Sequence, residues 1–347
     1  MRAAQGLIFF VALSSAGCWS LGYLAQQGVG ELRLLHARRK IVDVLADPTV
    51  SAHTKARLRL AMAARDFGIT QLGLRGGDAY TRYLETNGAP VAWNVSAAPK
   101  DQLKPHLHRF PITGAVPYLG FFREADARRE EARLKALGYD TYVRPVAGYS
   151  TLGITSDPIY SSMLEGDEAR VVEVTLHEML HGTLYLAGHS EWNESLATFV
   201  GLRGAALFFA QRSSESAARV LAEAERRDRR SEEFAQFLEP ILRELEALYA
   251  GPLPRDEKLR EREKIFARAH DGYLRRFPPK PGAPLPAFVA QPLNNAILIS
   301  FAVYHRSTPE HERLFARLHH DLRAFVALYK RAVENHQNDA IEWLRSK

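Results

Sequence analysis

The spacing of apolar and polar residues changes along this chain, from mixed in the first half to almost uniformly helical in the second. Apolar residues at helical intervals in residues 31–45 and 53–67 predict two helices joined at Asp47-Pro48. Three later runs are rich in β-branched and aromatic residues and predict strands at residues 91–95, 112–122 and 141–143. We therefore expect a small sheet in the N-terminal half.

Between the last two strands, residues 124–137 have the pattern of a charged amphipathic helix that ends at Gly138. From Glu168 the spacing is helical nearly to the C-terminus. The expected fold class is α+β, mainly helical. The proline-rich region 278–287 marks a possible boundary inside a domain of residues 18–347, which follows a leader of residues 1–17.

The composition describes a folded protein without a nucleic-acid-binding character. Hydrophobic residues make up 46% and charged residues 25% of the 347 residues, as in ordinary globular domains. The net charge of +6 arises from 46 Lys+Arg against 40 Asp+Glu, with opposite charges interspersed. Because the sequence has no dense basic run interleaved with aromatic residues, we expect no polynucleotide partner.

The N-terminus has the pattern of an export signal. Arg2 precedes the apolar run 7–13 and the small residues 14–17, and this run is shorter than the roughly 20 residues of a membrane span. The single cysteine, Cys18, follows directly and makes an intramolecular disulfide impossible. Lipidation of Cys18 is the first expectation, which predicts export to the periplasm and anchoring in the bacterial cell envelope. An uncleaved N-terminal anchor and a buried helix are the alternatives.

The stretch VTLHEMLHG, residues 174–182, contains the candidate metal-binding and catalytic residues. On a helix, His177 and His181 project from the same face one turn apart and can reach one ion together. Zinc accepts neutral imidazole nitrogens, and Glu178 lies where it can act on a water molecule beside the ion. The helix is apolar nearly all round, and burying these polar groups without a metal would cost several kcal/mol.

A catalytic zinc site needs a third protein ligand, and the following stretch WNESLATF offers Glu194. Ser190 is the expected N-cap of this second helix, which a short turn would fold back against the first. Glu191 and His189 are the alternative third ligands, because both lie within reach of the same turn. We expect one Zn²⁺ per chain, held by His177, His181 and Glu194.

HEMLH followed by WNESLATF resembles zinc metallopeptidases of the gluzincin type, in which the third ligand is the glutamate of an Asn-Glu pair on the helix after the His-Glu-x-x-His helix. Only residues 182–193 separate His181 from Glu194, fewer than in the large aminopeptidases and thermolysin-like enzymes of that type. Over most of its length the chain is similar to a bacterial family of predicted aminopeptidases, in segments such as RDFGITQLGL, VAWNVSAAP and LNNAILISFAVYH. Members of that family are often predicted lipoproteins, which agrees with Cys18.

These residues predict a zinc-dependent peptidase in which Glu178 is the general base and a peptide is the substrate. Candidate donors to the developing oxyanion are Tyr149, Tyr304 and His305. Two alternatives use the same site differently. One is a hydrolase of non-peptide amides, and the other is an envelope-anchored binding or scaffold protein whose zinc is structural.

Overall fold

The computed structural model describes most of the chain. It covers residues 34–110, 114–146, 156–212, 214–279, 285–305, 309–336 and 339–347, with Tyr23, Gly28, Gly30 and Gly282. Cys18 and the rest of the leader lie outside the described residues, as do Tyr149 and residues 280, 281, 283 and 284 of the boundary region 278–287. The leader and the internal boundary therefore stay predictions.

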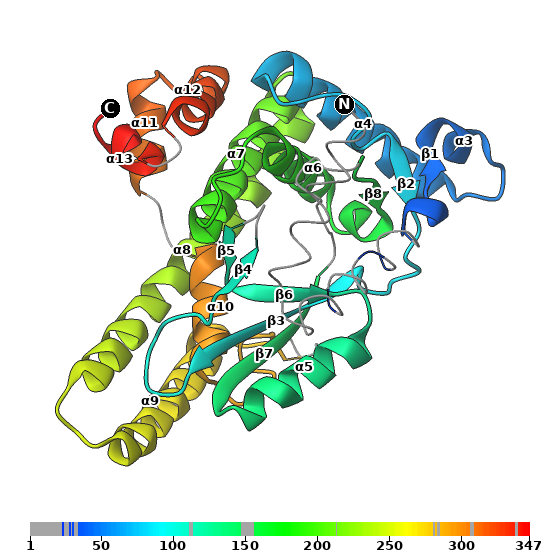
Figure 1. Ribbon diagram of the computed structural model, residues 1–347. Helices are drawn as coiled ribbons and strands as arrows, with labels where there is room; N and C mark the ends of the chain where they lie inside the picture. Colours follow the sequence, from blue (N-terminus) through cyan, green and yellow to red (C-terminus); the bar gives the residue numbers. More distant parts are fainter. Residues whose placement is uncertain are drawn as a thin grey trace, which may run out of the picture.

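The elements follow one another along the chain as Figure 1 labels them. The strands are β1 (Arg39–Lys40), β2 (Arg82–Leu84), β3 (Ala92–Pro99), β4 (His108–Phe110), β5 (Gly114–Val116), β6 (Tyr118–Phe121), β7 (Tyr139–Val146) and β8 (Ile159–Tyr160). The helices are α3 (Ile41–Ala46), α4 (Ala52–Leu72), α5 (Glu124–Ala136), the short 3-10 helix η1 (Ser161–Leu164), α6 (Glu168–Thr183), α7 (Ser190–Ala210), α8 (Ser214–Ala250), α9 (Arg255–Arg276), α10 (Asn295–His305), α11 (Pro309–Arg317), α12 (Leu322–Asn335) and α13 (Ala340–Arg345).

All described strands lie in the N-terminal half and the C-terminal half is helical, which confirms the mainly helical α+β class. The predicted strands correspond to β3, to β5 with β6, and to β7, and the predicted helix between them is α5. The expectation for residues 31–45 was wrong in part. β1 interrupts the helical pattern at Arg39–Lys40, because these residues pair with Arg82 and Tyr83 of β2 instead of continuing a helix.

The largest sheet is three-stranded, in the order β6-β3-β7, with both pairings antiparallel. One face carries Val95 and Val143 and packs on α5. The other face carries Ala98 and Tyr142 and packs under α8, α9 and α10 (Figure 1). This alternation of faces follows from the two-residue period of a strand, and it buries the sheet on both sides.

The ligand-bearing helices α6 and α7 lie side by side in the largest hydrophobic core, which they share with α4 and with the C-terminal helices α11–α13 (Figure 1). A second sheet, in the order β1-β2-β8, borders this core. The expected packing of the His-Glu-x-x-His helix against the next helix is thus observed.

None of the described helices combines the length and the hydropathy that a membrane-spanning helix needs.

Candidate metal centre

The helix α6 brings both histidines to one face. It begins after Asp167, whose side chain accepts a hydrogen bond from the Arg170 N–H at 2.8 Å, as an N-cap residue does. It ends at Leu184, where the backbone becomes extended. His177 and His181 lie in its second half, where their rings meet edge to face with centroids 4.8 Å apart.

A short turn returns the chain so that α7 starts beside the end of α6. Gly188 has φ 81° in this turn, a left-handed conformation that favours glycine. Asn193 closes the turn with two side-chain hydrogen bonds to Leu186: its Oδ1 accepts from the main-chain N–H at 2.9 Å and its Nδ2 donates to the carbonyl at 2.8 Å. The prediction that Ser190 is the N-cap was wrong by one position, since His189 occupies it, without a side-chain cap bond.

Close contact between the two helices depends on a glycine. A Cβ on Gly201 of α7 would lie 2.8 Å from the carbonyl oxygen of Glu173 and 3.3 Å from the Cβ of His177. The absence of a side chain there lets the backbone of α7 approach α6 next to His177. Gly201 thereby helps to set the distance between the helices that supply the three donors.

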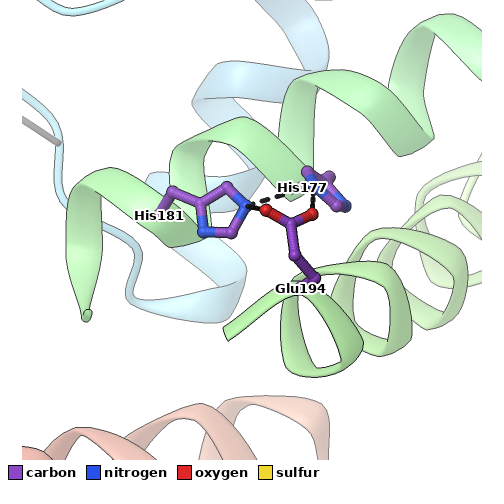
Figure 2. Close-up of side chains that lie close together, drawn as sticks. All are labelled: His177, His181 and Glu194. Atoms are coloured by element: carbon purple, nitrogen blue, oxygen red, sulfur yellow. Dashed lines mark hydrogen bonds and ion pairs between the residues drawn. The ribbon is translucent and has the colours of Figure 1, made fainter. Parts of the chain in front are cut away.

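Figure 2 shows the two histidines of α6 and Glu194 of α7 pointing toward one another. The Nε2 atoms of His177 and His181 are 3.2 Å apart, and each lies 3.6 Å from one oxygen of the Glu194 carboxylate. A tetrahedral zinc ion with ligand bonds of about 2.0–2.1 Å requires its ligand atoms to lie about 3.3–3.4 Å from one another. The donor types suit a zinc ion, and the imidazoles lie 3.6 Å from different oxygens of Glu194, Oε2 for His177 and Oε1 for His181, close to the separations that one ion requires.

Burial gives the three donors different proton affinities. Burial would raise the pKa of Glu194, but the contact with His177 and the charges of the histidines and Arg144 hold that pKa at about 2. Burial lowers the pKa of His181 to about 4. Burial alone would also lower the pKa of His177, but the carboxylates of Glu194 and Glu178 raise it above its ordinary value. An ionised carboxylate and a neutral imidazole are the forms in which these side chains bind metals.

Glu178 follows His177 on α6 and interacts electrostatically with His177 and Glu194. Burial raises the pKa of its carboxyl, and the charges of Glu194 and Asp157 act in the same direction. Asp157 is itself 4% exposed and lies just before β8. A carboxyl whose proton affinity is raised in this way suits a group that takes up a proton at neutral pH.

The structure brings one of the candidate third ligands together with the two histidines. Within the residues that it describes, the one group of three or more metal-binding side chains is His177, His181 and Glu194, whose ligand atoms lie within 4.8 Å of one another. The exposed side chains of Glu191 and His189 are not members. Tyr304 and His305 end α10, but their side chains, like Tyr149, lie outside the described part.

Two further residues at the site were missed in the sequence. Tyr185 lies in the turn between the ligand helices; burial and the charge of Glu194 raise the pKa of its phenol, although a hydrogen bond with Ser190 lowers it. Arg144 on β7 acts on Glu194 electrostatically. Tyr185 could have been found in the sequence, because it lies between HEMLH and WNESLATF. Arg144 is distant in sequence, and only the fold brings it near Glu194.

The fold and the site together define a mainly helical α+β protein with a possible metal-binding triad on adjacent helices. The sequence profile of the family described as "Putative aminopeptidase" matches residues 22–344, so the chain belongs to this family. The family expected from the sequence is thereby confirmed. Comparison with curated proteins and with solved structures gave no match.

Proposed function

We propose that this protein is a zinc-dependent aminopeptidase in which His177, His181 and Glu194 hold one Zn²⁺ and Glu178 is the general base. The observation that carries the proposal is the convergence of two imidazole nitrogens and one carboxylate at separations of 3.2 and 3.6 Å. Membership in the putative aminopeptidase family supports peptide hydrolysis as the reaction. Peptides with a free N-terminal amine are the proposed substrates.

The bound ion would supply Lewis-acid activation of a water molecule and of the scissile carbonyl. The chain's own residues perform the remaining tasks. Glu178 accepts the proton of the attacking water and donates it to the leaving amine, a role that the raised pKa of its carboxyl supports. Tyr185 is a described phenol that interacts electrostatically with Glu194, and it is our candidate for the hydrogen-bond donor to the developing oxyanion.

The decisive experiment separates metal binding from turnover. Glu178→Gln keeps all three ligands, so we expect it to retain about one zinc per chain by elemental analysis and to lose aminopeptidase activity at least about 1,000-fold. The matched control is Glu168→Gln on the same helix, whose exposed side chain lies in the first turn. It should retain both the zinc and the activity.

The substrate class needs its own comparison. Amino-acid anilides with a free amine should be cleaved, whereas the same compounds with an acetylated amine should not. Equal cleavage of internal bonds in blocked peptides would replace the aminopeptidase assignment with an endopeptidase. No zinc in the intact protein after reconstitution would overturn the metallopeptidase proposal itself.

We further propose that residues 1–17 direct export and that Cys18 anchors the mature protein in the cell envelope, on the sequence pattern alone. Mass spectrometry of the expressed protein should show a lipid on Cys18, and the Cys18→Ala variant should carry none. An unmodified Cys18 in the unchanged protein would contradict lipid anchoring.

A further inference from the structure

The two sequence neighbours of Glu194 connect the first turns of α7 to two different parts of the fold. On its N-terminal side, Asn193 is bonded to the main chain of Leu186 in the turn that leaves α6. On its C-terminal side, Ser195 contacts His311 of α11, whose side chain is fully buried. The ligand carboxylate is thus bracketed by one link to the preceding turn and one link to the C-terminal helices.

The second link is a chain of hydrogen bonds with a single direction. The hydroxyl of Ser195 donates to the Trp192 carbonyl at 3.0 Å, so its oxygen is left to accept from Nε2 of His311 at 3.2 Å. Nε2 therefore carries the imidazole proton, and Nδ1 accepts from the hydroxyl of Tyr329 on α12 at 2.6 Å. Each of these groups donates its one proton to the next, from Tyr329 to His311, from His311 to Ser195, and from Ser195 to the Trp192 carbonyl.

This chain runs through aromatic surroundings. Tyr329 stacks on Trp192 with ring centroids 5.7 Å apart, and Phe199 and Phe325 meet the His311 ring edge to face. A buried polar chain in such a core is stable only when every member is satisfied, and then it admits one arrangement of its members. An apolar cluster of the same size would tolerate small rotations of α7, which this chain excludes.

We propose that His311 is a positioning residue of the metal centre: through Ser195 it fixes the first turns of α7, and thereby the place of the Glu194 carboxylate opposite the two histidines. The inference rests on the proposed zinc site, since its readout is metal affinity. His311 does not touch the metal ligands within the described structure. Residues that orient a ligand from outside the coordination sphere typically alter metal affinity by about 10–100-fold when they are replaced.

The test compares three full-length variants with the unchanged protein. His311→Leu removes both ring nitrogens, whereas His311→Gln keeps an amide N–H near the position of Nε2. Tyr329→Phe removes the hydroxyl that Nδ1 accepts from but leaves the bond from Nε2 to Ser195. Zinc affinity is measured by competition with a chelator, the ligand geometry by the visible absorption of the Co²⁺-substituted protein, and folding by thermal unfolding of the zinc-free protein.

We expect His311→Leu to weaken zinc binding by about 10-fold or more and to change the Co²⁺ spectrum. His311→Gln should restore the affinity to within about threefold. Tyr329→Phe should lower the unfolding temperature of the zinc-free protein but leave the affinity within about threefold, which separates positioning from general loss of stability. If His311→Leu does not fold, Ser195→Ala removes the accepting oxygen alone and should show the same loss of affinity.

Equal zinc affinity in the unchanged protein and in His311→Leu, or in Ser195→Ala where His311→Leu does not fold, would overturn the positioning role and leave the zinc site intact. A loss of affinity in Tyr329→Phe as large as in His311→Leu would also overturn it, because stability would then explain both. If the unchanged protein itself binds no zinc, the proposed function fails and this inference fails with it.

Discussion

Two polar clusters in this protein each contain a buried carboxylate, but they differ in the charged groups that surround it. Between the sheet β6-β3-β7 and the helices α9 and α10, Asp140 accepts hydrogen bonds from Arg262 at 2.7 and 3.3 Å and from the Asn295 N–H at 3.1 Å. Between α6 and α7, Glu194 faces two imidazoles at 3.6 Å. The first cluster contains the guanidinium of Arg262, and the second brings together three side chains that could hold a metal ion.

The partners of the first cluster are all groups of the chain itself. Arg262 also donates to the Lys100 carbonyl at 2.6 Å, and Asn295 donates to the Pro99 carbonyl and accepts from Tyr249. This cluster, which we call the Arg262 cluster, joins α8, α9 and α10 to β3 and β7 with its charges paired. In the histidine–glutamate group the carboxylates raise the pKa of His177 and the histidines lower that of Glu194. A metal cation bound by the three side chains would take the place of the proton on His177.

Breaking the Arg262 cluster should have the largest effect on folding. Arg262→Leu leaves Asp140 buried at 7% exposure without its counter-ion, and removing one partner of a buried pair costs about 3–5 kcal/mol. Urea unfolding of the zinc-free protein measures this cost. Arg260→Leu, on the exposed surface of the same helix, is the control and should change the unfolding free energy by less than about 0.5 kcal/mol. Equal losses in both variants would contradict the structural role of the cluster.

Binding of zinc should stabilise the histidine–glutamate group. A zinc concentration 100 to 1,000 times the dissociation constant should raise the unfolding free energy by about 3–4 kcal/mol. Glu194→Ala should abolish this increment, and a chelator should reverse it in the unchanged protein. Arg260→Leu should retain the full increment. A zinc increment that survives in Glu194→Ala would show that the ion binds elsewhere.

Spacing between the ligand helices can be changed without touching a ligand. Gly201→Ala places a methyl group 2.8 Å from the Glu173 carbonyl, and overpacking of this kind costs about 1–3 kcal/mol. We expect weaker zinc binding as well, because α7 must move away from His177. Gly182→Ala is the matched control: it lies on α6 next to a ligand, but its Cβ would meet nothing within 4 Å. Its zinc affinity should be unchanged.

Lowering the pH should reduce the unfolding free energy through His311, a buried histidine outside both clusters. Burial lowers the pKa of His311 to about 4, whereas an unfolded histidine titrates near 6.5, so the unfolded state binds more protons between these values. The contribution of His311 is present above pH 6.5 and is lost as the pH falls toward 4, by about 1 kcal/mol at pH 5.5. His311→Gln should show a shallower fall of the unfolding free energy over this range; an identical slope would contradict the assignment.

The candidate metal centre shows most clearly which site residues could be predicted from the sequence. The four-residue interval between His177 and His181 places both rings on one helical face wherever that helix forms, so this pair was predictable. The sequence favoured Glu194 over Glu191 and His189, but the choice depended on how the turn between the helices closes. Asn193 and Gly188 close it, through tertiary hydrogen bonds and a left-handed backbone that spacing alone does not specify.

The mainly helical α+β class and the family were determined by the sequence itself, because local periodicity and a motif of fixed spacing are encoded in neighbouring residues. Only the tertiary structure decided which distant residues meet. Ser195 bonds His311, and Asp140 bonds Arg262, across more than 100 residues of chain in each case. Such pairs leave no local pattern, since packing of whole helices brings them together, and the close approach at Gly201 that sets the ligand separations has the same origin.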